Sequence, residues 1–97
     1  MLTGKQKRYL RSLAVNEKAL VQIGKDNLTP NLFKSVKEVL KTKELVKVSV
    51  LKSCELDMNE IVVDLCANTN AELVQIIGKT IVLYKQSKEK IIKLPWI

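Results

Sequence analysis

A loop at residues 24–27 has the composition needed to hold a phosphate group. An apolar segment at 20–23 leads into Gly24-Lys25-Asp26-Asn27, and a helix is expected to begin directly after the loop. Gly24 lets the backbone bend without a Cβ clash, and Asn27 tolerates a left-handed conformation. The start of the helix adds unpaired N–H groups and a positive dipole end, and Lys25 adds a cation. The loop therefore predicts a binding site for an anion.

Basic side chains recur on both sides of this loop. One group lies in the segment before it and the other in the helix after it, and spacings of three and four residues align each group along one side of a helix. We expect packing against a sheet to merge both rows and the loop into one surface that binds a nucleic-acid backbone. The candidate RNA-binding residues are Gly24, Lys25, Asn27, Lys5, Lys7, Arg8, Arg11, Lys34, Lys37 and Lys41, with Lys79 and Lys85 as secondary contacts.

Less specific interpretations of the same residues stay open. Gly24 fits an ordinary turn between a strand and a helix, each basic row fits a solvated helix face, and Gly78-Lys79 fits a simple turn. Aromatic residues make up only 4% of the chain, so stacking of bases on an aromatic platform is a poor candidate. The predicted contacts are therefore to phosphates, which carry no sequence information.

The distribution of charge favours a polyanion as partner. The 97 residues carry a formal net charge of +7, with a sequence pI near 9.5. Residues 1–52 hold 12 Lys and Arg against 4 acids, whereas residues 53–97 hold 5 Lys against 6 acids. All of the excess positive charge thus lies in the half that contains the loop, which predicts one basic face.

Catalysis, cofactors and small-molecule substrates are not expected. The chain has no histidine, no GxxxxGK[ST] phosphate loop and no nucleophile elbow. Asp57, Glu60 and Asp64 share a helix side on which a magnesium ion is conceivable, but helix capping and solvation explain these acids more simply. Cys54 and Cys66 lack the spacing of a redox or zinc motif and are expected to be reduced, buried thiols.

No membrane segment or secretion signal is expected either. No apolar run approaches the ~20 residues that span a bilayer, and the first residues lack a signal-peptide core. The expected compartment is the cytoplasm.

The pattern of apolar residues predicts a single α/β domain. Thr3 and Gln6 form a capping box for a first helix, and Thr29 with Pro30 starts a second. Alternation of strands and helices favours a four-stranded sheet with helices packed on it. The predicted order is α-β-α-β-α-β-β, with helices at 3–14, 30–42 and 57–68, strands at 20–23, 45–51, 73–77 and 80–85, a type II′ hairpin at Gly78-Lys79 and a basic tail at 86–97.

Blocks spread over most of the chain resemble the YhbY-like CRM-domain family. The resemblance rests on residues 2–10 (LTGKQKRYL), 21–25 (VQIGK), 45–48 (LVKV) and 74–84 (VQIIGKTIVLY), which follow the order of the family. It implies a stand-alone bacterial CRM domain that spans residues 1–97 and is similar in fold to the C-terminal domain of a bacterial translation initiation factor. It further implies RNA binding, association with precursors of the large ribosomal subunit, and a role in ribosome maturation. Plant relatives act in the splicing of organellar introns.

The loop departs from the family pattern at its end. Relatives usually have Gly-x-x-Gly, as in the loop with which KH-type domains clamp a nucleic-acid backbone, whereas this chain has Asn27 in the last position. We expect the bend to survive, and we expect Asp26 to weaken anion binding unless it points away. One alternative function is a protein-interaction module that docks on ribosomal or other acidic surfaces without recognising RNA directly. The oligomeric state is left open.

Overall fold

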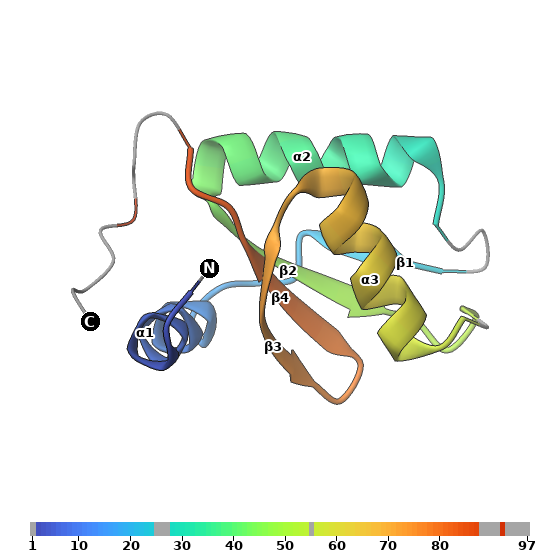
Figure 1. The fold of residues 1–97 in the computed structure, drawn as a ribbon. Coiled ribbons are helices and arrows are strands. Elements are labelled where there is room, and N and C mark those ends of the chain that lie inside the picture. The colour runs from blue at the N-terminus through green and yellow to red at the C-terminus, as the bar shows by residue number, and fades with distance from the viewer. Residues whose placement is uncertain (1, 25–27, 55, 88–91, 93–97) are drawn as a thin grey trace.

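The computed structural model describes residues 2–24, 28–54, 56–87 and 92 (Figure 1). The predicted Lys25 and Asn27 contacts, the neighbouring Asp26 and most of the tail at 86–97 lie outside this part of the chain. The predicted order of elements is confirmed: α1 (Gly4–Ala14), β1 (Val21–Ile23), α2 (Pro30–Lys43), β2 (Leu45–Val50), α3 (Met58–Thr69), β3 (Glu72–Ile77) and β4 (Thr80–Tyr84).

The helices begin where their capping residues predict. Thr3 Oγ1 accepts the Gln6 N–H at 3.1 Å, and Gln6 Oε1 accepts the Thr3 N–H at 3.0 Å, which completes the capping box of α1. Thr29 caps α2 by accepting the Leu32 N–H at 3.1 Å, with Pro30 in the first turn. Each cap satisfies backbone donors that would otherwise lack partners at the helix start.

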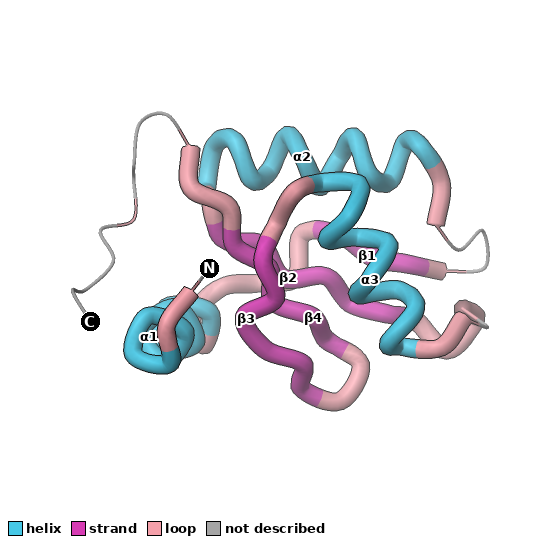
Figure 2. The backbone as a smooth tube through the Cα atoms, in the orientation of Figure 1, coloured by secondary structure: helices cyan, strands magenta, loops and turns pink. Residues whose placement is uncertain are grey.

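The four strands form one mixed sheet in the order β1-β2-β4-β3 (Figure 2). β1 runs parallel to β2, and the other neighbours are antiparallel. At the hairpin between β3 and β4, Gly78 has a φ of 56°, and Lys79 is not among the described residues with positive φ. A type I′ turn would need positive φ at both residues, so the backbone agrees with the predicted type II′ turn.

Helices cover both faces of the sheet. α2 and α3 pack on one face around a core that includes Val36, Leu40, Ile61 and Leu65. α1 packs on the opposite face, where Leu10 and Ala14 meet a second set of buried strand residues (Figure 1). This second set consists of Leu45, Val74, Val82 and Tyr84.

Alternation along β4 explains why helices occur on both faces. Ile81 and Leu83 belong to the core under α2 and α3, whereas Val82 and Tyr84 belong to the core under α1. Successive side chains of a strand point to opposite faces, so an uninterrupted apolar strand must be covered on both. All four of these residues are buried, with at most 2% of their surface exposed.

Glu44 ties the end of α2 to the segment after β4. It is the C-cap of α2, has a left-handed φ of 63°, and is fully buried. Its carboxylate accepts the N–H groups of Ser87 at 2.6 Å and of Ile92 at 2.7 Å, and its carbonyl accepts the Lys85 N–H at 2.9 Å. The Ser87 hydroxyl also donates to the carboxylate. We call this region, formed by Glu44, Lys85, Ser87 and Ile92, the anchor end.

Candidate nucleic-acid interface

Three backbone segments meet at the end of the sheet where β1 and β2 stop. The Leu51 N–H donates to the Ile23 carbonyl at 2.8 Å, so the turn after β2 lies beside the beginning of the 24–27 loop. The Val50 N–H donates to the Lys79 carbonyl at 2.7 Å, which places the hairpin turn on the other side of β2. We call this region the loop end and define it by Gly24, residues 51–53 and Gly78-Lys79.

The spacing of strands sets the width of the loop end. The Ile23 carbonyl accepts from Leu51, directly after β2, and the Lys79 carbonyl accepts from Val50, the last residue of β2, so the two lie at opposite edges of that strand. Neighbouring strands lie about 4.8 Å apart, so these two backbones are separated by about 10 Å. Segments that are more than fifty residues apart in sequence therefore lie close together at this end of the sheet.

Gly24 is not needed to avoid a Cβ clash at the bend. A Cβ added to Gly24 would lie 3.4 Å from Leu51 Cδ1 and 3.5 Å from Ser53 Oγ, which are ordinary van der Waals distances. Its φ also lies outside the left-handed region. The predicted Cβ clash at the bend is therefore absent, and the structure itself does not require glycine at this position.

Two cations lie at the loop end, and a third lies near the start of α2, the helix that follows the loop in sequence. Lys52 follows β2, Lys79 lies in the hairpin turn, and Lys34 is on α2, about 6 Å along the helix axis from Pro30. All three side chains are exposed. Lys52 was not among the predicted contacts. In the sequence, Lys52 comes directly after the predicted strand at 45–51. A parallel pairing of this strand with the 20–23 segment would put Lys52 near the loop.

The N-terminus of α2 offers fewer free donors than predicted. Pro30 has no N–H, the Leu32 N–H is bound to Thr29 Oγ1, and the Phe33 N–H is bound to the Thr29 carbonyl at 3.2 Å. Within the described part of the chain this leaves the Asn31 N–H of the first turn. An anion at this helix end would therefore depend mainly on the loop and on lysine side chains.

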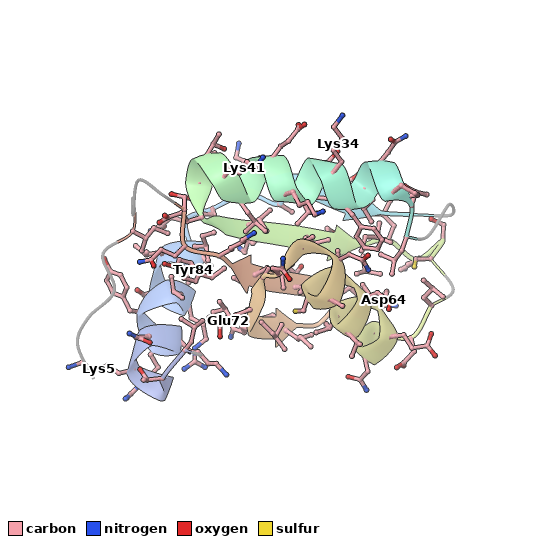
Figure 3. The ribbon with its side chains drawn as sticks, turned by 45° about the horizontal axis from the view of Figure 1, so that its top comes forward. Lys5, Lys34, Lys41, Asp64, Glu72 and Tyr84 are labelled. Carbon is pink, nitrogen blue, oxygen red and sulfur yellow. The ribbon has the colours of Figure 1, made fainter. Side chains whose placement is uncertain are left out.

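The two predicted basic rows lie on different faces of the sheet. Lys34, Lys37 and Lys41 are exposed on α2, and Figure 3 shows Lys34 and Lys41 pointing away from the sheet. The row of α1 lies on the helix that packs on the opposite face, where Lys5 is labelled in Figure 3. The prediction that sheet packing merges both rows into one face is therefore wrong, because Leu10 and Ala14 bind α1 to the other set of strand side chains. In the α1 row, Lys5, Lys7 and Arg8 are exposed and Arg11 is half-buried.

The two secondary contacts are also separated. Lys79 lies at the loop end, whereas Lys85 lies at the anchor end, where its N–H donates to Glu44. Six residues of extended strand separate them, which corresponds to about 20 Å. Of the two, only Lys79 lies at the loop end.

α3 gives its side of the molecule an acidic surface. Glu60 and Asp64 are exposed, and Asp57 caps the helix by accepting the Asn59 N–H at 3.2 Å. Residues 57–69 contain no Lys or Arg. Among the described residues, no group of His, Cys, Asp and Glu is arranged to hold a metal ion. The acids of α3 therefore act as helix caps and as a surface that repels phosphate.

The two cysteines belong to the core under α2 and α3. Cys54 is buried in this core, and Cys66 is half-buried and packs against it. Burial, with a smaller contribution from Glu72, raises the pKa of the Cys66 thiol above its ordinary value. Thiolate is the reactive form, so this shift makes Cys66 less nucleophilic.

No helix in the described part of the chain is both long and apolar enough to cross a membrane.

Comparison with known proteins places this chain in a family. The model of the CRS1/YhbY (CRM) domain matches residues 2–85. "Probable RNA-binding protein YqeI" of Bacillus subtilis is 51% identical over 96 residues, which cover 98% of this chain and 100% of that protein. An "RNA-binding protein" of Haemophilus influenzae is 34% identical over 97% of this chain and 95% of its own length.

A solved structure agrees with these relatives. The solution structure of SAV1595 from Staphylococcus aureus, whose title presents it as a candidate RNA-binding protein, has a TM-score of 0.81 and 49% sequence identity. The match covers 98% of this chain and 100% of that chain. Matches of this extent in both sequence and fold mean that the chain belongs to the CRS1/YhbY (CRM) domain family.

Proposed function

We propose that this protein binds RNA by contacting backbone phosphates at the loop end. The observation that carries the proposal is that backbone hydrogen bonds hold the turns bearing the exposed Lys52 and Lys79 at the end of the sheet where β1 stops, in a family whose relatives are named as RNA-binding proteins. The exposed Lys34 of α2 is assigned to the same proposed site. Lys25 belongs to the same proposed site. The finer part of the proposal is that the RNA is ribosomal and belongs to the precursor of the large subunit.

The exposure of the lysines suits them to phosphate binding. A cation that stays in water pays little desolvation cost when it meets a phosphate, and the release of counterions from the RNA adds a favourable, salt-dependent contribution. Exposed lysines on separate turns can contact more than one phosphate of the same RNA. The proposal therefore assigns affinity to this end and assigns no base preference to it.

The acidic surface of α3 supports a defined orientation of the RNA. α2 and α3 pack beside each other on one face of the sheet, yet the exposed side of α2 carries three lysines and that of α3 carries acids. RNA near α3 would meet like charge, so the proposal places it over the loop end and α2. The catalytic alternative has no support from a metal-binding arrangement in the described residues.

Charge reversal at the loop end tests the proposal. We expect Lys34→Glu/Lys52→Glu/Lys79→Glu to lower affinity for a structured rRNA fragment by at least about 30-fold near 100 mM salt, and to reduce the slope of log K against log salt by roughly 3. Fluorescence anisotropy measures both quantities. Folding should be unchanged, because all three side chains are exposed.

A matched control separates position from total charge. Lys18→Glu/Lys43→Glu/Lys85→Glu changes the net charge equally at three exposed residues away from the loop end. We expect this variant to lose only a few-fold in affinity. Equal losses in both triple variants would mean that binding depends on total charge, and the assignment of the site would be wrong.

Precursor particles test the finer part. We expect the protein to cosediment with large-subunit precursors from cells, and RNase treatment or an excess of free rRNA to release it. Association that survives both treatments would favour the alternative, a module that docks on ribosomal proteins. Crosslinking followed by RNA sequencing should give a discrete footprint on precursor rRNA, whereas scattered reads would leave a general RNA binder.

A further inference from the structure

The sheet face toward α1 is only partly covered by that helix. α1 packs on strand residues at the end of the sheet remote from the loops. The cross-strand row nearest the loop end points to this same face and extends over all four strands. The row follows from the pairing of Gln22 with Ser49, Ser49 with Thr80, and Thr80 with Ile77. We call these residues, Gln22, Ser49, Thr80 and Ile77, the open row.

Exposure distinguishes the open row from its neighbours on the same strands. Gln22 is exposed, Ser49 and Thr80 are half-buried, and Ile77 exposes 55% of its surface. The adjacent residues that point to the other face, under α2 and α3, include Val21, Val48, Val50 and Ile81, and all of these are at least 93% buried. Three strands therefore combine a fully covered side with an open one.

The polar members of the row have hydrogen-bonding capacity that the fold does not use. The side chains of Gln22, Ser49 and Thr80 make no hydrogen bond within the part of the chain that the structure describes. An amide and two hydroxyls offer both donors and acceptors. With a strand spacing of about 4.8 Å, the row extends about 14 Å across the sheet, enough for two or three nucleotides.

Cations border the row, and apolar surface is confined to its edges. Lys79 precedes Thr80 in the hairpin turn, and Lys47 lies on the same face one pair further from the loop end. The Lys47 ammonium group donates to the Glu17 carbonyl at 3.2 Å. Ile77 lies at one edge of the sheet and Leu20, which exposes 50% of its surface, at the other. Among the described residues, the polar side chains of Gln22, Ser49 and Thr80 separate these two apolar side chains, so the row itself is not a continuous apolar patch of the kind that favours a second copy of the chain.

We infer that the open row contacts the bases of single-stranded RNA whose phosphates are held at the loop end. The inference rests on the proposed function. Phosphate contacts at the loop end fix the position of the strand, and the polar side chains then meet the Watson–Crick edges of unpaired bases. Such edges are accessible only where RNA is single-stranded. The row therefore supplies a preference for unpaired RNA and for particular bases, which the lysines alone do not provide.

The test compares labelled RNA homopolymers of about 12 nucleotides with a duplex of equal length. For the wild-type protein, we expect single strands to bind at least about 3-fold more tightly than the duplex, and oligo(A), oligo(C) and oligo(U) to bind with unequal affinities. Gln22→Ala/Ser49→Ala/Thr80→Ala removes the unused hydrogen-bonding side chains without a change in charge. This variant should lose about 3- to 10-fold in affinity for the preferred homopolymer. The preference should shrink while the salt slope stays the same.

Two controls guard this test. Ser35→Ala/Asn59→Ala/Gln86→Ala removes three exposed polar side chains outside the row and should keep the wild-type preferences. Circular dichroism melting checks folding. If the triple variant melts early, Gln22→Ala alone carries the test, because Gln22 is exposed and its truncation should leave stability unchanged.

The possible results separate the inference from the proposed function. Unchanged affinity and preference in the row variant would overturn the inference, as would equal binding of duplex and single strands by the wild type. Both results would leave phosphate binding at the loop end intact. A wild-type protein that binds none of these RNAs or the rRNA fragment would overturn both proposals. A change from dimer to monomer in the row variant, measured by sedimentation, would show that the row contacts a second copy of the chain instead.

Discussion

The loop end and the anchor end lie at opposite ends of β4, and they differ in whether their charged side chains are buried or exposed. At the anchor end, the Glu44 carboxylate is fully buried and accepts backbone N–H groups of Ser87 and Ile92. At the loop end, Lys52 and Lys79 are exposed on turns that backbone hydrogen bonds hold beside the last residues of β1 and β2. The anchor end therefore has a buried charged group that is bound within the fold, whereas the charged groups of the loop end are exposed to solvent.

The difference indicates that stability and binding depend on separate residues. A buried charge is tolerated only when hydrogen bonds satisfy it, so its removal leaves buried partners unpaired. An exposed lysine contributes little to folding but keeps its full capacity to attract phosphate. Substitutions at the anchor end should therefore change the free energy of unfolding, and substitutions at the loop end should change the affinity for RNA.

The largest effect is expected at Glu44. Glu44→Ala should lower the free energy of unfolding by about 3 kcal/mol, because it leaves the Ser87 and Ile92 N–H groups without their acceptor. Urea unfolding measures this loss. The affinity of the folded fraction for RNA should stay within about twofold of wild type, since the loop end is intact.

Two further variants separate the carboxylate from the backbone. Glu44→Gly loses the same carboxylate but suits the left-handed φ of 63°, so it should be about 1 kcal/mol more stable than Glu44→Ala. Glu38→Ala, at an exposed residue of α2, should change stability by less than about 0.5 kcal/mol. A Glu44→Ala protein as stable as Glu38→Ala would contradict the role of the anchor end.

A smaller effect is expected from the cations of α1. Lys5→Glu/Arg8→Glu reverses two exposed charges on the helix that packs on the opposite face from α2. We expect an affinity loss of about 2- to 5-fold from long-range electrostatics, much less than Lys52→Glu/Lys79→Glu with the same change in charge. Anisotropy titrations at equal salt compare the two variants. A greater loss for the α1 variant would move the principal site to the other side of the sheet.

The smallest effect is expected at Tyr84, which lies between the sheet and α1. Its buried hydroxyl has no hydrogen-bond partner among the described residues, so Tyr84→Phe should stay within about 1 kcal/mol of wild type near pH 7. Burial, and then Glu44 and Glu72, raise the pKa of Tyr84. A raised pKa in the folded state means that wild-type stability falls as the pH rises above the ordinary tyrosine value of about 10.

Thermal melts over the alkaline range test this sign. Tyr84→Phe should lose less stability than wild type above about pH 10, because it has no phenol to ionise. Parallel stability curves for the two proteins would contradict the assigned shift.

Local features of the fold were predictable from the sequence. Capping residues such as Thr3 and Thr29 fixed the helix starts, and the alternation of Val46, Val48 and Val50 marked β2. The apolar run through β4 also contained the information that both faces of the sheet are covered. Coverage of both faces is incompatible with the predicted merging of the two basic rows, because α1 and α2 then lie on opposite sides of the sheet.

Features that depend on strand order were not predictable in the same way. Lys52 and Lys79 lie beside Gly24 only because β2 stands between β1 and β4, and no local pattern specifies that order. Glu44 is flanked in sequence by Lys43 and Leu45 and has the composition of an exposed turn, yet contacts more than forty residues away bury it. Hydrogen bonds between segments far apart in sequence determine both the positions of Lys52 and Lys79 and the burial of Glu44.

NMR titration of the ¹⁵N-labelled protein with an unpaired RNA oligonucleotide tests the central claim most directly. We predict that the amide signals of residues 22–24, 51–53 and 78–80 shift together as RNA is added, while those of α3 and of Lys85 and Ser87 stay in place. Shifts confined to α1, α3 or the anchor end, with the signals of the loop end unmoved, would contradict the claim.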